Sequence, residues 1–244
     1  RSLDDTLVDN EKTYRWLKFG GIKGQAESLI VAAQDQAIST NYFKRIILKE
    51  EIGSKCRLCK EYEETIDHLS SGCPILVKNE HIVRHDKVCL HLHYSICKEF
   101  GIEVPDNWYS HVPKSVCEHE GITVLWNQGV QTDREVLVNR PDIIIKKKQK
   151  KTCILIDVSV PWDRNVVQKE AEKKLKYKNL SIEIQRMWNV KCFVIPVIIG
   201  ATGTVSRGLR KYLELIPGKH SIDSLQKISY PGNITQYYSA NLEA

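Results

Sequence analysis

The stretch that most constrains the fold of this chain is residues 139–163, NRPDIIIKKKQKKTCILIDVSVPWD. Two runs rich in β-branched residues flank a lysine-rich segment, which is the pattern of a β-hairpin with an exposed turn. Asp142 stands at the start of the first run. Asp157 lies inside the second, which is apolar on both faces and is therefore predicted to be a central strand. Such a hairpin would bring both aspartates to one end of a sheet.

The pattern of the whole chain predicts an α/β fold after a helical region. We expect strands near residues 121–127, 141–145, 152–160 and 192–199. One long amphipathic helix is expected over residues 164–188 and another over residues 205–215. We divide the chain into a helical linker region, a Cys/His module, a helical connector, an α/β domain and a loose tail, at residues 1–52, 53–75, 76–117, 118–227 and 228–244.

The two aspartates predict a site for a hard divalent cation. A lone carboxylate in a central strand is costly to ionise, and a cation relieves that cost. Two carboxylates, a backbone carbonyl, water and phosphate oxygens suit Mg²⁺ or Mn²⁺, and such a site hydrolyses phosphodiesters. The following helix supplies the basic groups for this chemistry, Lys169, Lys173 and Lys174, with Tyr177 one turn beyond Lys173. The alternative is that both aspartates are structural.

Positive charge is concentrated around the same region. The chain has a net charge of +6, and residues 140–178 alone carry twelve Lys/Arg against five Asp/Glu. A localised positive field indicates a polyanionic partner, which we interpret as DNA, with RNA as a further partner. The alternative is a solvated helix face with a charged loop tip. The candidate contacts are Arg140, Lys146, Lys147, Lys148 and Lys169.

A second motif has the spacing of a metal site, Cys56-x2-Cys59-x8-His68-x4-Cys73. Three thiolates and one imidazole form the tetrahedral donor set that structural zinc prefers. The alternatives are coincidental reduced cysteines or a redox Cys-x-x-Cys pair. Four further histidines are interpreted as polar surface residues or phosphate contacts rather than as a second zinc site: His81, His85, His91 and His93.

These motifs, taken in order, resemble one family. A Cys-Cys-His-Cys knuckle, then RHD at 84–86, then RPDIII…ILIDVSVPWD and KEAEKKLKYKNL are similar to the carboxy-terminal region of non-LTR retrotransposon polyproteins. In that family a reverse transcriptase precedes a zinc knuckle and a restriction-like endonuclease. The resemblance implies a PD-(D/E)xK core, a mixed central sheet flanked by helices, that nicks target DNA for integration.

The resemblance also implies roles for single residues. Asp142 and Asp157 would be the metal-binding carboxylates, and Lys174 the displaced catalytic lysine, with Lys173 its rival by register. Tyr177 would be a further active-site residue. Arg84 and His85 would match a basic-His motif that contacts nucleic acid.

The context expected for such a chain is intracellular. The sparse cysteines indicate a reducing compartment, and a DNA target places the protein in the nucleus. No run of apolar residues is long enough to span a membrane. The chain holds no reverse transcriptase core and does not begin with Met, so we expect a fragment of a longer protein that is normally fused to a reverse transcriptase. The competing hypotheses are a non-catalytic nucleic-acid-binding module derived from a retrotransposon and a protein-interaction scaffold.

Overall fold

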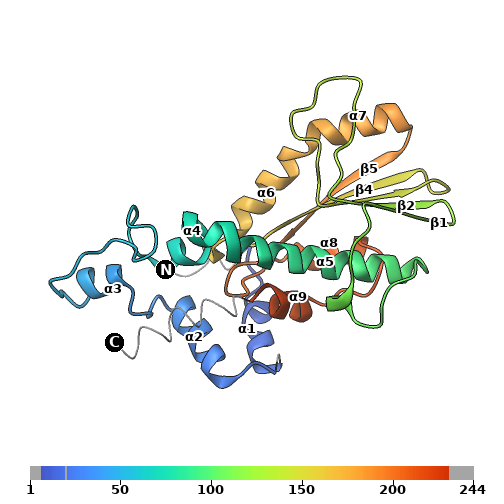
Figure 1. Cartoon of the computed structure of the whole chain (residues 1–244). Helices are drawn as coiled ribbons and strands as arrows, with labels where there is room; N and C mark the ends of the chain where they lie inside the picture. The colour runs from blue at the N-terminus through green and yellow to red at the C-terminus, as the bar shows by residue number, and fades with distance from the viewer. Residues whose placement is uncertain (1–6, 20, 231–244) are drawn as a thin grey trace.

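The computed structural model describes residues 7–19 and 21–230, and its centre is a five-stranded mixed sheet (Figure 1). The strands lie in the order β1-β2-β3-β4-β5. The first three pairings are antiparallel, and β4 pairs with β5 in parallel. The strands are β1 (Val116–His119), β2 (Ile122–Trp126), β3 (Ile143–Lys147), β4 (Thr152–Ser159) and β5 (Lys191–Ile198).

Helices cover both faces of the sheet (Figure 1). On one face α5, α8 and α9 enclose the larger apolar core, which includes Leu92, Ile156 and Leu225. On the other face α6 and α7 enclose a second core around Tyr177 and Leu180. Because β4 and β5 are parallel, the chain needs a crossover between them, and α6 and α7 form it. These helices are α5 (Ile82–Glu99), α6 (Val166–Lys176), α7 (Lys178–Trp188), α8 (Leu209–Leu215) and α9 (Ile222–Ser229).

This arrangement confirms the predicted mixed α/β class and the hairpin. β3 and β4 are antiparallel, with Ile143 opposite Ile156 and Lys147 opposite Thr152, so the lysine segment is the turn. The expected single helix over 164–188 is wrong, because the chain breaks into α6 and α7 at Tyr177 (φ −101°, ψ 9°). The short strand β1 and the helix α9 were not predicted.

The N-terminal helices pack onto the α/β part of the chain. Val8 forms a β-bridge with Ser206, and the side chain of Gln226 donates to the carbonyl oxygens of Lys12 and Gly203. Trp16 is fully buried. The region predicted as a linker is therefore part of the folded body. Its helices are α1 (Asn10–Phe19), α2 (Gly24–Gln34) and α3 (Asn41–Ile46).

The predicted segment boundaries agree only partly with the elements. The boundary at residues 117 and 118 falls inside β1, and the predicted tail begins inside α9, which ends at Ser229. Residues 231–244 of that tail lie outside the described residues. The Cys/His module consists of loops and a π-helical turn, His68–Gly72, followed by the short helix α4 (Pro74–Leu76) and a second π-helical turn (Val77–His81) that leads into α5.

Candidate active site and metal centre

The open end of the β3–β4 hairpin carries both predicted aspartates. Ile143 and Ile156 are a cross-strand pair, so Asp142 and Asp157 are each one residue beyond it. Asp142 lies just before β3 and Asp157 lies near the end of β4, so both are at the open end of the hairpin. The carboxylate of Asp142 accepts a hydrogen bond from the backbone N–H of Val158 at 2.7 Å, and so extends the ladder past the end of β3.

Asp157 is 2% exposed and is surrounded by donors from the α6–α7 junction. The Tyr177 hydroxyl donates to its Oδ1 at 2.5 Å. Lys173 forms an ion pair with Oδ2, and Lys176 Nζ lies 3.4 Å from Oδ1. Two ammonium groups offset the cost of burying this carboxylate. Burial, together with the hydrogen bond to Asp157, raises the pKa of Tyr177, so its hydroxyl keeps its proton near neutral pH.

The two rival lysines of α6 face different partners. Lys173 contacts Asp157, whereas Lys174 Nζ lies 3.2 Å from Glu170 Oε1 and also contacts the Tyr212 hydroxyl. The structure therefore brings Lys173, not Lys174, to the aspartates. Sequence reasoning missed Lys176. Lys176 could have been found from its spacing, because it lies three residues after Lys173, and residues three or four apart share one helix face.

His85 joins the site from α5 on the opposite face of the sheet. Its Nε2 lies 3.3 Å from Asp142 Oδ2, and its Nδ1 lies 3.0 Å from Asp86 Oδ1. Burial alone would lower the pKa of His85, but the two carboxylates outweigh it and raise this pKa to about 9. Burial would likewise raise the pKa of Asp142, yet the His85 hydrogen bond holds it below its usual range. Near neutral pH the two form a charged pair.

Two groups of predicted nucleic-acid contacts lie elsewhere. Arg84 is only 4% exposed and donates to the carbonyl of Ser70, so its burial does not fit a surface contact with DNA.

Lys146 and Lys147 lie over the rings of Trp188 and Phe100, respectively, at the turn end of the hairpin. With about 3.3 Å per strand residue, that end is roughly 15 Å from Asp142.

The remaining predicted contacts vary in their distance from the site. The exposed Lys148 lies in the turn that follows Lys146 and Lys147 at the end of β3. Lys169 pairs with Glu172 at 2.6 Å on the exposed side of α6. Arg140 lies beside the site, where its carbonyl oxygen accepts a hydrogen bond from Tyr177 at 3.0 Å. The basic groups in contact with the aspartates are therefore His85 of α5 and Lys173 and Lys176 of α6.

Asp142 and Asp157 both offer carboxylate oxygens at the open end of the hairpin. Asp157 Oδ2 is buried and forms an ion pair with the Lys173 ammonium. Asp142 is held ionised by His85. Carboxylate oxygens are the donor type that Mg²⁺ and Mn²⁺ prefer. His85, Cys89 and Asp142 also have ligand atoms within 4.8 Å of one another, so these three residues are close enough to share an ion.

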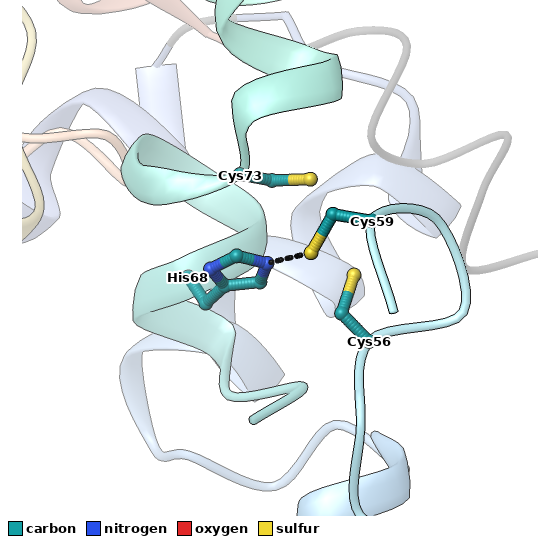
Figure 2. A group of neighbouring side chains, drawn as sticks. All are labelled: Cys56, Cys59, His68 and Cys73. Carbon is teal, nitrogen blue, oxygen red and sulfur yellow. Dashed lines mark hydrogen bonds between the residues drawn. The ribbon is translucent and has the colours of Figure 1, made fainter. Parts of the chain in front are cut away.

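The four residues of the Cys/His motif converge on one point (Figure 2). Their ligand atoms all lie within 4.8 Å of one another, and Cys59 Sγ is 3.3 Å from His68 Nε2. Cys56 and Cys73 are fully buried. Burial lowers the pKa of His68, which keeps the imidazole neutral and able to ligate. These groups can hold a metal ion, as the spacing predicted.

Hydrogen bonds within the module preform this geometry. The amide N–H of Cys56 donates to the Tyr62 carbonyl at 2.8 Å, and that of Lys60 donates to the Cys56 carbonyl at 2.9 Å. Lys60 has a φ of 63°, the left-handed conformation that closes the tight turn after Cys59. Arg57 binds the buried carboxylate of Glu64 with its side chain and its amide N–H. These bonds hold the loop that carries Cys56 and Cys59 in place before any metal binds.

The module docks beside the aspartate site. Trp162, which follows β4, is buried in one apolar cluster with Cys56 and Cys73. Arg164, at the entrance to α6, forms an ion pair with Asp67. The module and the aspartates thus flank the same end of β4.

A scan against protein-family models finds no match for this chain, and a search of curated proteins finds no matching relative. Among the residues that the structure describes, no helix has the length and hydrophobicity needed to cross a membrane.

Proposed function

We propose that this protein is a metal-dependent DNA endonuclease of the PD-(D/E)xK type that nicks a target site for retrotransposon integration. The observation that carries the proposal is the placement of Asp142 and Asp157 at the open end of one hairpin, with Lys173 and Lys176 on Asp157. Buried, oriented carboxylates beside cationic groups are the components that phosphodiester hydrolysis needs. The motif resemblance to the retrotransposon endonucleases supports the same function.

Each residue of the site has a role in this proposal. Asp142 and Asp157 would hold Mg²⁺ or Mn²⁺, which polarises the phosphoryl oxygen and activates water. Lys173 would offset the negative charge that develops on the phosphoryl oxygens as water attacks phosphorus and the bond to the 3′ oxygen breaks, leaving a 3′ hydroxyl and a 5′ phosphate. His85 keeps the Asp142 carboxylate ionised and in place. Tyr177 orients Asp157 through the hydroxyl hydrogen bond.

The Cys/His module would bind zinc and help to hold DNA. A donor set of three sulfurs and one nitrogen with every position filled by protein is typical of structural zinc. Its contact with Trp162 places it at the end of β4 that carries Asp157. The protein would act in the nucleus, and the 3′ hydroxyl at the nick would prime a reverse transcriptase to which the domain is normally fused.

The test is a plasmid-nicking assay with Mg²⁺, Mn²⁺ or EDTA. We expect conversion of supercoiled to nicked circles with either metal and none with EDTA. Asp157→Asn and Asp142→Asn should abolish nicking but leave DNA binding near the wild-type level, measured by a gel-shift titration. Undiminished nicking by purified Asp157→Asn protein would contradict the assigned site.

A non-catalytic nucleic-acid-binding module is the second candidate. It is favoured by the two lysine ion pairs that already offset the charge of Asp157, since a carboxylate so neutralised can be purely structural. This candidate predicts DNA binding with a steep salt dependence, about 0.9 per phosphate contact in log K against log salt, and no nicking with any divalent metal.

A further inference from the structure

A second cluster of metal-ligating side chains lies in the core, away from both sites described above. His93 and Cys97 are four residues apart on α5, so they project from the same face. His111 reaches them from the loop that follows the short 3₁₀ helix Trp108–Ser110. The ligand atoms of these three residues all lie within 4.8 Å of one another. From the sequence alone, His93 was considered for a second zinc site and set aside, and it was not connected with His111, which is distant in the chain.

The spacing within the cluster suits a tetrahedral ion. His93 Nδ1 lies 3.6 Å from Cys97 Sγ and 2.8 Å from His111 Nε2. Ligand atoms about 2.0 to 2.3 Å from a tetrahedral zinc are roughly 3.3 to 3.8 Å apart. The sulfur–nitrogen distance already falls in this range. The nitrogen–nitrogen distance is about 0.5 Å shorter than this range, so the two imidazole rings would move apart by that amount when the ion binds.

The three side chains are buried, and a further cysteine lies next to them. His93 and Cys97 are fully buried and His111 is 9% exposed. Cys117 of β1, which is 9% exposed, lies outside this group of ligand atoms but forms a side-chain hydrogen bond with the Cys97 thiol. A rotation of the Cys117 side chain toward the two imidazoles would therefore supply a fourth donor. Trp126 packs edge-on against the His93 ring at 5.3 Å, and Tyr94 packs edge-on against His111 at 5.7 Å. Two imidazoles and two thiols, walled by aromatic rings, are a donor set typical of closed structural zinc sites.

We propose that His93, Cys97 and His111 bind a second structural zinc ion, with Cys117 as the fourth ligand. The ion connects α5, the loop at residue 111 and the edge strand β1. The Cys/His module precedes α5 and this cluster lies near its C-terminal end, so zinc fixes the helix at both ends. His85, which holds Asp142, is carried by the same helix. The proposal does not depend on nuclease activity.

Zinc content per chain tests the proposal. Zinc-loaded protein freed of excess metal should contain about two zinc ions by elemental analysis. His111→Asn should retain about one, and Cys59→Ser should also retain about one, because each variant removes a different site. His119→Asn, which changes an exposed histidine on β1, is the matched control and should keep both. A circular dichroism spectrum matching the wild type confirms that each variant is folded.

X-ray absorption at the zinc edge on the wild-type protein needs no variant. With both sites filled, the average shell should hold about 2.5 sulfur ligands, against about 3 for the Cys/His module alone. A single zinc per chain with about three sulfur ligands, unchanged in content in His111→Asn, would overturn the proposal. If the Cys/His module itself binds no zinc, Cys59→Ser loses none while His111→Asn still does, so the two sites are tested separately.

Discussion

Lys173 and Lys174 are adjacent on α6, but their ammonium groups contact different carboxylates. Lys173 pairs with Asp157, and Lys174 pairs with Glu170 and Tyr212. We expect Lys173→Met to slow nicking by about 100-fold or more, the usual effect of removing one transition-state donor. Lys174→Met is the matched control and should nick at close to the wild-type rate. Single-turnover nicking with Mg²⁺ measures both, and an equal loss in the two variants would contradict the assignment to Lys173.

The sequence predicted which residues lie together when they are close in the chain or paired by strand register. The four ligands of the Cys/His module fall within 18 residues, and the hairpin pattern placed Asp142 and Asp157 together. What could not be predicted depends on distant contacts. Arg84 is buried because the Ser70 carbonyl accepts its hydrogen bond, and His93 is buried beside His111. The interpretation of His93 as a polar surface residue is therefore wrong.

Glu64 is a buried carboxylate that supports the Cys/His module through Arg57. Glu64→Gln should lower the free energy of unfolding at pH 7 by about 2 kcal/mol, since it weakens a buried charged hydrogen bond. Burial would raise the pKa of Glu64, but the bonds from Arg57 outweigh it and lower this pKa. The stabilisation is thus present above the unfolded pKa of about 4.3 and is lost as the pH falls through the lower folded value.

The difference between wild type and Glu64→Gln should therefore shrink below about pH 4, as measured by denaturant unfolding of zinc-free protein at every pH, because acid protonates the zinc ligands. Glu63→Gln, in the exposed pair with Lys55, is the matched control and should change stability little. A difference that stays constant into acid would show that the charge of Glu64 does not contribute to stability.

At the scale of elements, the break between α6 and α7 matters most. The apolar stripe of residues 164–188 continues across it, so periodicity alone predicted one helix. The break at Tyr177 lets α6 and α7 both lie on the sheet while the Tyr177 hydroxyl reaches Asp157. β1 was missed because four residues, of which only Cys117 is buried, carry too little pattern.

The turn after β5 links the sheet to the N-terminal helix α1. Gly203 has a φ of 100°, which L side chains rarely adopt, and a Cβ there would clash with the indole ring of Trp16. Gly203→Ala should lower the free energy of unfolding by about 2 kcal/mol or more, from backbone strain and displacement of Trp16. Gly53→Ala, where no atom lies within 4 Å of the added Cβ, is the control and should change it little. Denaturant unfolding measures both, and equal stability would contradict the contact between α1 and this turn.

At the scale of the whole molecule, the segments predicted as separate units pack into one body. α1 contacts α9, and the Cys/His module shares an apolar cluster with Trp162 and Ala201. The order of segments was readable from composition and motifs, but their packing was not, because it rests on single residues such as Trp16 and Trp162. As a result, the Cys/His module and α5 both contact the end of the sheet that holds the aspartates, the module through Trp162 and α5 through His85.

The central claim is that Asp142 and Asp157 share one divalent cation. Electron paramagnetic resonance of Mn²⁺, titrated into zinc-loaded protein with a short DNA duplex, measures this binding directly. The account predicts one bound Mn²⁺ in the wild type and its loss in both Asp142→Asn and Asp157→Asn, with duplex binding retained. An unchanged bound Mn²⁺ in either variant would contradict a shared site.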